Sequence, residues 1–334
     1  MPRIASLTSR SLANIAVQQA IKLFPFTGEN ISTSASKAQL GGGYRVANTS
    51  TWSFTASSVN FSGTGLPYHS YGNLDSPYNP GVQNYNITWT YRGGTNVSGA
   101  KDTPKDALIG LWLNGVAIYN PVSASEKPDG FITPDGFTLS ASYEASQDFN
   151  YSFGQDLAGG HAVVPNRYHY HDASFFESWL TGSGHVSGTF GQTGIAECSI
   201  INYLKSGLVH PNGHSKILGI SADGYPIYGP YGYDDPVDST SGIKRMVTSY
   251  TLYPATIRQD TTTEDTIAYP MGIFIADYAY NASGDLDQHN GRYCTTPDYP
   301  EGTYAYFVTV DTEGGPVYPY VIGTSYYGSP AKMS

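Results

Sequence analysis

The sequence predicts an all-β protein, built as a single large, loop-rich, β-sandwich-like domain. Its 334 residues include 29 tyrosines, 38 glycines and 21 prolines. Tyrosine favours strands because its ring packs while its hydroxyl stays hydrated, and glycine and proline mark turns. Hydrophobic residues make up 40% of the chain and charged residues only 13%. This composition is typical of a rigid globular protein and not of a disordered one.

The chain divides into an N-terminal segment, residues 1–45, and a β domain, residues 46–334. Residues 11–24 carry apolar side chains at helical spacing and are followed by Pro25 and Gly28, which end the predicted helix. Small polar residues then lead to Gly41-Gly42-Gly43, which suggests a flexible attachment arm. An N-terminus that packs on its own domain is the alternative.

From residue 46 onward, short strands alternate with turns, and we find no internal repeat or change of composition. Asn114-Gly115 is a strong hairpin signal between two apolar segments. A second short helix is expected at residues 174–180. The predicted strands are residues 52–56, 85–91, 109–113, 116–119, 304–310 and 317–322.

Charge and hydropathy exclude several classes of partner. The net charge of −10 argues against nucleic acid, because phosphate binding requires a cationic surface. Eighteen consecutive apolar residues occur nowhere in the sequence, so no membrane span is expected. The N-terminus lacks the apolar core of a secretory signal, which favours synthesis without a signal peptide. Cys198 and Cys294 could form a disulfide or remain free.

The clearest chemical signal is a pair of histidines, His169 and His171, within a Tyr-His-Tyr-His run. Residues two apart on a strand point to the same face, with Cα atoms roughly 6–7 Å apart. Their imidazoles could therefore converge on one ion, with His161 as a third ligand, and imidazole nitrogen suits zinc and copper. The alternative is that these histidines bond to backbone carbonyls and tyrosine hydroxyls in a polar core.

Several further elements, in the same order along the chain, resemble the YHYH-domain family, which is named for this tetrapeptide. They cover roughly residues 50 to 330 and include a long block that contains Asp223-Gly224-Tyr225-Pro226. The family occurs in bacteria and marine phages and has no settled biochemical activity. Two positions depart from its pattern: Asp172-Ala173 replaces the usual Gly and Pro, and His289 stands where Cys is common. The matching elements are residues 66–69, 113–116, 156, 160–162, 168–171, 214–229, 285–292, 301–307 and 318–320.

Together the spacing and the resemblance define the candidate metal ligands. His161, His169 and His171 form the best primary set, which suits zinc or copper with one further position open or filled by a carboxylate. Calcium at Asp234-Asp235 or Asp285 and Asp287 fits less well than solvated loop acids. The wider set of candidates, which includes a fourth ligand or a hydrogen-bond acceptor behind an imidazole, is His69, Asp156, His214, Asp223, Asp287 and His289.

Residues 2–12 resemble the start of virion structural proteins of marine phages, especially fibre and appendage proteins. Our favoured hypothesis is therefore a non-enzymatic virion protein, made in the host cytoplasm, whose β domain is displayed on the particle. Its partners would be other virion proteins, copies of itself and host-surface glycans. The alternatives are a metalloenzyme that uses the histidine cluster, and a glycan-binding module without a metal.

Overall fold

The structure of the chain is a computed structural model. It describes residues 50–54, 58–66, 80–90, 101–103, 108–113, 115–120, 122–126, 138–140, 160–163, 166–173, 209–254, 257–259, 268–270, 277–312, 316–331 and 333. Over these residues the secondary structure is almost entirely strands and turns, which confirms the all-β prediction. The two expected helices, at residues 11–24 and 174–180, and the domain boundary at residue 45 lie outside the described residues. In the part that is described, no helix is long and apolar enough to cross a bilayer.

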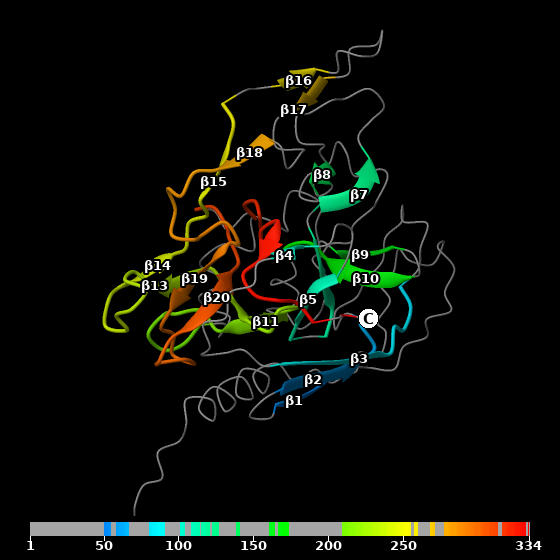
Figure 1. Cartoon of the computed structure of the whole chain (residues 1–334), viewed down its shortest axis with the longest axis horizontal. Helices are drawn as coiled ribbons and strands as arrows, with labels where there is room; N and C mark the ends of the chain where they lie inside the picture. Colours follow the sequence, from blue (N-terminus) through cyan, green and yellow to red (C-terminus); the bar gives the residue numbers. More distant parts are fainter. Residues whose placement is uncertain are drawn as a thin grey trace, which may run out of the picture.

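The centre of the fold is an eight-stranded sheet with the strand order β19-β20-β12-β11-β5-β6-β10-β9 (Figure 1). Neighbouring strands are antiparallel except for two parallel pairs, β6 with β10 and β12 with β20. β9 is therefore an edge strand of this sheet. The bounds are β5 Leu108–Trp112, β6 Ala117–Tyr119, β9 Gly160–Val163, β10 Arg167–Tyr170, β11 Ile217–Ser221, β12 Pro226–Tyr228, β19 Gly291–Cys294 and β20 Thr303–Phe307.

A second, three-stranded antiparallel sheet packs against one face of the large sheet. It consists of β1 (Ser50–Phe54), β2 (Ser58–Gly63) and β3 (Tyr85–Thr90). Its buried side chains share one apolar core with residues of β5, β6, β11, β12 and β20, and Figure 1 shows β1–β3 lying along the side of β5 and β11. This arrangement of two facing sheets is sandwich-like, as the alternating strand pattern predicted.

Five two-stranded sheets complete the described part of the fold. They pair β4 with β21, β7 with β8, β13 with β14, β15 with β18 and β16 with β17. Their bounds are β4 Lys101–Asp102, β7 Val122–Glu126, β8 Thr138–Ser140, β13 Tyr231–Tyr233, β14 Ile243–Arg245, β15 Tyr250–Leu252, β16 Ile257–Gln259, β17 Ala268–Pro270, β18 Tyr278–Tyr280 and β21 Ser325–Tyr326.

The period-two pattern of the strands divides the apolar residues between two cores, one on each face of the large sheet. In β20, Tyr304 and Tyr306 belong to one core, whereas Ala305 and Phe307 belong to the other. Both faces of this strand are covered, so all five of its residues are buried. A strand that is buried on both faces has few positions for charged residues. Tyrosine fits such positions because its large ring packs in the core while its hydroxyl makes a hydrogen bond.

The turns follow the glycine signals of the sequence. Gly115 has a φ of 85° in the predicted hairpin between β5 and β6, and its amide donates to the Trp112 carbonyl oxygen at 2.8 Å. Gly224 has the same φ between β11 and β12, and its amide donates to the Ser221 carbonyl oxygen at 2.9 Å. Glycine adopts this left-handed conformation without steric cost, so both turns close tightly.

The strand predicted at residues 317–322 is wrong, because this segment forms turns. The amide of Tyr320 donates to the carbonyl oxygen of Val317, and that of Val321 to the carbonyl oxygen of Pro319, both at 2.8 Å. Pro319 has no amide hydrogen to donate to a ladder. Tyr318, Tyr320, Val321 and Ile322 are nevertheless buried, in the core on the face of the large sheet away from β1–β3.

Candidate metal centre

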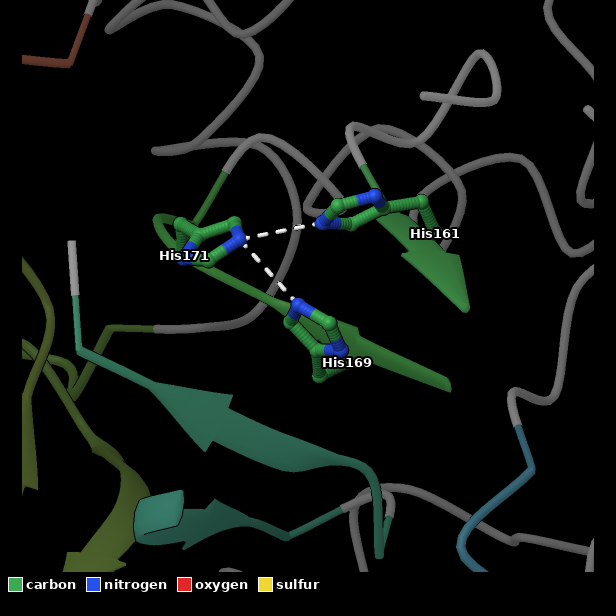
Figure 2. A group of neighbouring side chains, drawn as sticks. All are labelled: His161, His169 and His171. Carbon is green, nitrogen blue, oxygen red and sulfur yellow. Dashed lines mark hydrogen bonds between the residues drawn. The ribbon is translucent and has the colours of Figure 1, made fainter. Parts of the chain in front are cut away.

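Three histidines converge at the edge of the large sheet, on the hairpin formed by β9 and β10. The register of this hairpin places His161 opposite His169, and His171 follows directly after β10. His169 and His171 point to the same side of the sheet, while Tyr168 and Tyr170 pack in the core on the opposite side. Figure 2 shows the three imidazoles turned toward one another.

The spacing of the ring nitrogens fits a single metal ion. The Nε2 atom of His171 lies 3.1 Å from Nε2 of His161 and 3.1 Å from Nε2 of His169. One nitrogen from each of the three histidines lies within 4.8 Å of the others. Nitrogens that bind a tetrahedral zinc ion at about 2.0–2.1 Å are separated by about 3.3 Å. The three side chains could therefore hold a metal ion between them.

Backbone carbonyl groups determine which nitrogen carries the proton. Nδ1 of His169 lies 3.1 Å from the carbonyl oxygen of Arg167, and Nδ1 of His171 lies 3.1 Å from that of Asn120. A carbonyl oxygen only accepts hydrogen bonds, so both Nδ1 atoms are protonated and both Nε2 atoms present lone pairs. Such carbonyl partners commonly orient metal-binding histidines. Two lone pairs only 3.1 Å apart repel each other unless a cation lies between them.

Burial keeps His169 and His171 uncharged. The exposed fractions are 3% for His161, 0% for His169 and 7% for His171. Desolvation, together with the neighbouring His161, lowers the pKa of His171 to about 3. Desolvation, followed by the effect of His161 and His171, holds the pKa of His169 well below its usual range. At neutral pH the neutral imidazoles are ready to bind a metal, and protons compete poorly for the lone pairs.

Two residues of β6 and its following loop support the cluster, and sequence reasoning missed both. The Tyr119 ring stacks on the His169 ring with centroids 3.8 Å apart and an interplanar angle of 18°. The Tyr119 hydroxyl oxygen accepts a hydrogen bond from Nη1 of Arg167 at 3.0 Å. Asn120 contributes the carbonyl group that fixes His171. The parallel pairing of β6 with β10 brings these residues together, and no local sequence signal encodes that pairing.

The structure does not bring the other described candidate histidines into this group. The group within 4.8 Å comprises His161, His169 and His171, among the residues whose positions the structure gives. His214 lies before β11 with its Nδ1 2.7 Å from the carbonyl oxygen of Ser215. His289 lies before β19 with its Nδ1 2.8 Å from the hydroxyl of Ser325.

The acidic candidates also have other partners. Asp223, in the turn after β11, accepts hydrogen bonds from the Tyr306 hydroxyl and the Gly328 amide, both at 2.8 Å. The Tyr304 hydroxyl donates to the Asp287 carboxylate and lies 2.9 and 3.0 Å from its two oxygens. His69 and Asp156 lie outside the described residues.

The structure also shows the surroundings of two acidic residues considered as calcium ligands and of one cysteine. Lys244 pairs with Asp234 at 2.7 Å and with Asp285 at 2.8 Å, so a cation already lies beside both carboxylates. Cys294 is a free buried thiol, and burial raises its pKa to about 11. Cys198 lies outside the described residues.

Comparison with known proteins agrees with the tetrapeptide at the centre of this site. Residues 86–318, well over half of the chain, match the family model described as YHYH protein. The chain belongs to the YHYH family. The matched region contains all three histidines, both strands that carry them, and the supporting Tyr119 and Asn120. No curated protein and no solved structure matches the chain.

Proposed function

We propose that this YHYH protein binds one zinc or copper ion through His161, His169 and His171. The observation that carries the proposal is the contact between two Nε2 lone pairs at 3.1 Å, since the Nδ1 atoms of the same rings are committed to carbonyl oxygens. A hydrogen-bonded polar core would place a donor between these nitrogens. A bound cation removes the repulsion and uses all the lone pairs.

The three proposed ligands carry no charge. Three neutral imidazoles supply no negative charge, so a divalent ion keeps its full formal charge and polarises any fourth ligand strongly. Imidazole-rich sites suit zinc and copper, and copper(II) binds such sites more tightly than zinc. For this reason both metals belong in the experiment.

The experiment is to measure metal content by elemental mass spectrometry after expression with each metal. We expect close to one equivalent in the wild-type protein and loss of the metal in the His169→Ala/His171→Ala double variant. His210→Ala is the matched control, because it removes a partly exposed histidine that lies outside the group. An equal metal content in all three proteins, or none in the wild type, would refute the proposal.

A metalloenzyme is the second candidate function, and the number of protein ligands favours it. Within the described part of the chain the group contains three ligands, and catalytic sites often combine three protein ligands with one exchangeable position. Cobalt(II)-substituted protein would be titrated with azide and followed by visible absorption. A spectral change at saturable azide concentrations would support an exchangeable position, and an unchanged spectrum would indicate a closed structural site.

The biological setting that we propose is a phage virion, in which the β domain is displayed for assembly or host adhesion. The supporting observations are the virion-like sequence of residues 2–12 and the tyrosine-rich surface, where Tyr253, Tyr280 and Tyr293 are each at least 40% exposed. Quantitative mass spectrometry of purified particles would show the protein at high copy number. Glycan binding that is lost on substitution of these tyrosines, but kept in the histidine double variant, would instead favour a lectin-like module.

A further inference from the structure

Arg167 presents a hydrogen-bonding edge that the described protein does not use. It lies on β10 two residues before His169, and therefore on the same face as His169 and His171. Its Nη1 donates to the Tyr119 hydroxyl at 3.0 Å. Its Nε is buried and has no hydrogen-bond partner, and among the described residues the hydrogen bond of this guanidinium is the one from Nη1. Nε and Nη2 together form the side-on edge with which arginine binds two oxygens of a carboxylate or phosphate.

Within the described part of the chain, the charge of Arg167 also has no acidic partner. The guanidinium keeps its positive charge at any physiological pH. The groups that face it are the hydroxyls of Tyr119 and Tyr85, and no described carboxylate pairs with it. In a protein with 27 acidic and 17 basic residues, an arginine without an acidic partner is unexpected on electrostatic grounds. A partly buried cation of this kind is stabilised when an anion binds.

Tyr85 adds a second unused donor near this cation. It lies at the start of β3, in the sheet that shares a core with β6, and its side chain is only 7% exposed. Its hydroxyl is buried and makes no hydrogen bond. Desolvation raises the pKa of Tyr85 well above its usual range even though the Arg167 charge opposes this shift, so the hydroxyl remains protonated. A buried hydroxyl without a partner is costly unless a ligand or water completes it.

We propose that Arg167 and Tyr85 form a subsite for an oxyanion, a carboxylate or a phosphate group, beside the histidine cluster. The side-on edge of Arg167 would bind two oxygens, and the Tyr85 hydroxyl would donate to one of them. Tyr119 links the subsite to the cluster, since its hydroxyl contacts Arg167 and its ring stacks on His169. The placement beside a metal rests on the proposed function, whereas the anion-binding groups do not.

The side chains of Arg167 and His169 are close enough to contact one small anionic ligand. Residues two apart on a strand have Cα atoms roughly 6–7 Å apart, so Arg167 and His169 lie within the span of a few bonded atoms. A molecule held by its anionic group at Arg167 would place its neighbouring atoms beside the histidine cluster. The inferred ligand class is therefore a small carboxylate or phosphate compound with a second polar group.

The test uses isothermal titration calorimetry with acetate and with inorganic phosphate, on the full chain with and without metal. We expect at least one anion to bind the metal-free wild type saturably. Binding should weaken at least ten-fold in Arg167→Lys, which keeps the charge but lacks the two-donor edge, and several-fold in Tyr85→Phe. The His169 bond to the Arg167 backbone is unaffected by this change. Arg245→Lys and Tyr293→Phe, an arginine and a tyrosine outside the subsite, are the matched controls and should bind like the wild type.

The outcomes separate this inference from the metal proposal. Anion binding that requires metal and is equal in Arg167→Lys would place the anion on the metal itself and overturn the subsite. Anion binding to a protein that never takes up metal would support the subsite while the metal proposal fails. The subsite would also be overturned if neither anion bound saturably to the protein with or without metal. If one anion binds more tightly than the other, the difference identifies the oxyanion that the subsite prefers.

Discussion

His214 should make the stability of this protein depend on pH. Its ring is fully buried, with the rings of Tyr233 and Tyr228 at 4.9 and 5.3 Å. Nδ1 contacts the Ser215 carbonyl oxygen at 2.7 Å, and Nε2 has no hydrogen-bond partner. Burial lowers the pKa of His214 to about 4, and the nearby His210 and Arg292 act in the same direction, while the Ser215 carbonyl and Asp298 oppose them.

The size of the effect follows from the gap between the folded and unfolded pKa values. The unfolded side chain titrates near 6.5, so it takes up a proton at a pH where the folded side chain remains neutral. Stability is therefore fully present above about pH 6.5 and is lost as the pH falls toward 4. A gap of about 2.5 units at about 1.4 kcal/mol per unit corresponds to roughly 3 kcal/mol of unfolding free energy.

The assay compares urea unfolding of the wild type and His214→Asn from pH 8 to pH 4, both without metal. Asparagine keeps an N–H donor for the Ser215 carbonyl, so the variant removes the titrating group and retains the local bond. Any packing loss is the same at every pH and cancels in the comparison. We expect the wild type to lose roughly 3 kcal/mol more than the variant on acidification. Curves that run parallel over this range would refute the argument.

Three further predictions concern the metal, a close contact and a buried acid. A zinc concentration one hundred times the dissociation constant should raise the unfolding free energy by about 2.7 kcal/mol in the wild type but not in His169→Ala/His171→Ala, as measured by urea unfolding. Gly160→Ala should lower the free energy of unfolding by about 1–3 kcal/mol, because a Cβ at this position would clash with the Tyr168 hydroxyl. If this clash is the cause, adding Tyr168→Phe to the same chain should restore part of the lost stability, as measured by thermal unfolding. Asp223→Ala should cost on the order of 3 kcal/mol, because the Tyr306 hydroxyl and the Gly328 amide lose their acceptor, and an unchanged denaturation midpoint would contradict this.

The sequence predicted much of the local structure. Alternation located β3 at Tyr85–Thr90 within one residue, and the glycine of the Asn-Gly pair located the β5–β6 hairpin. The strand predicted at residues 304–310 overlaps β20 at Thr303–Phe307 but extends three residues too far. The segment at residues 317–322 was misread because its apolar residues pack from turns, and burial alone does not distinguish a strand from a turn that covers a core.

The three histidines could be predicted, but their surroundings could not. The spacing of His169 and His171 implies a shared face whatever their partners are, and His161 lies within reach through a short hairpin. Tyr119 and Arg167 became part of the site through the pairing of β6 with β10, two strands about fifty residues apart. Nothing in either segment specifies that register, which depends on packing across the whole sheet.

All three proposed metal ligands belong to one hairpin at the β9 end of the large sheet, between residues 161 and 171. A metal bound there closes a loop of only about ten residues, so it removes little entropy from the unfolded chain as a whole. The stabilisation is therefore local. A bound metal would hold β9 and β10 together, whereas the stability of the other strands depends on the two apolar cores. Because the stabilisation is local, amide hydrogen exchange of residues 160–171 should slow on metal binding far more than that of β11 and β20.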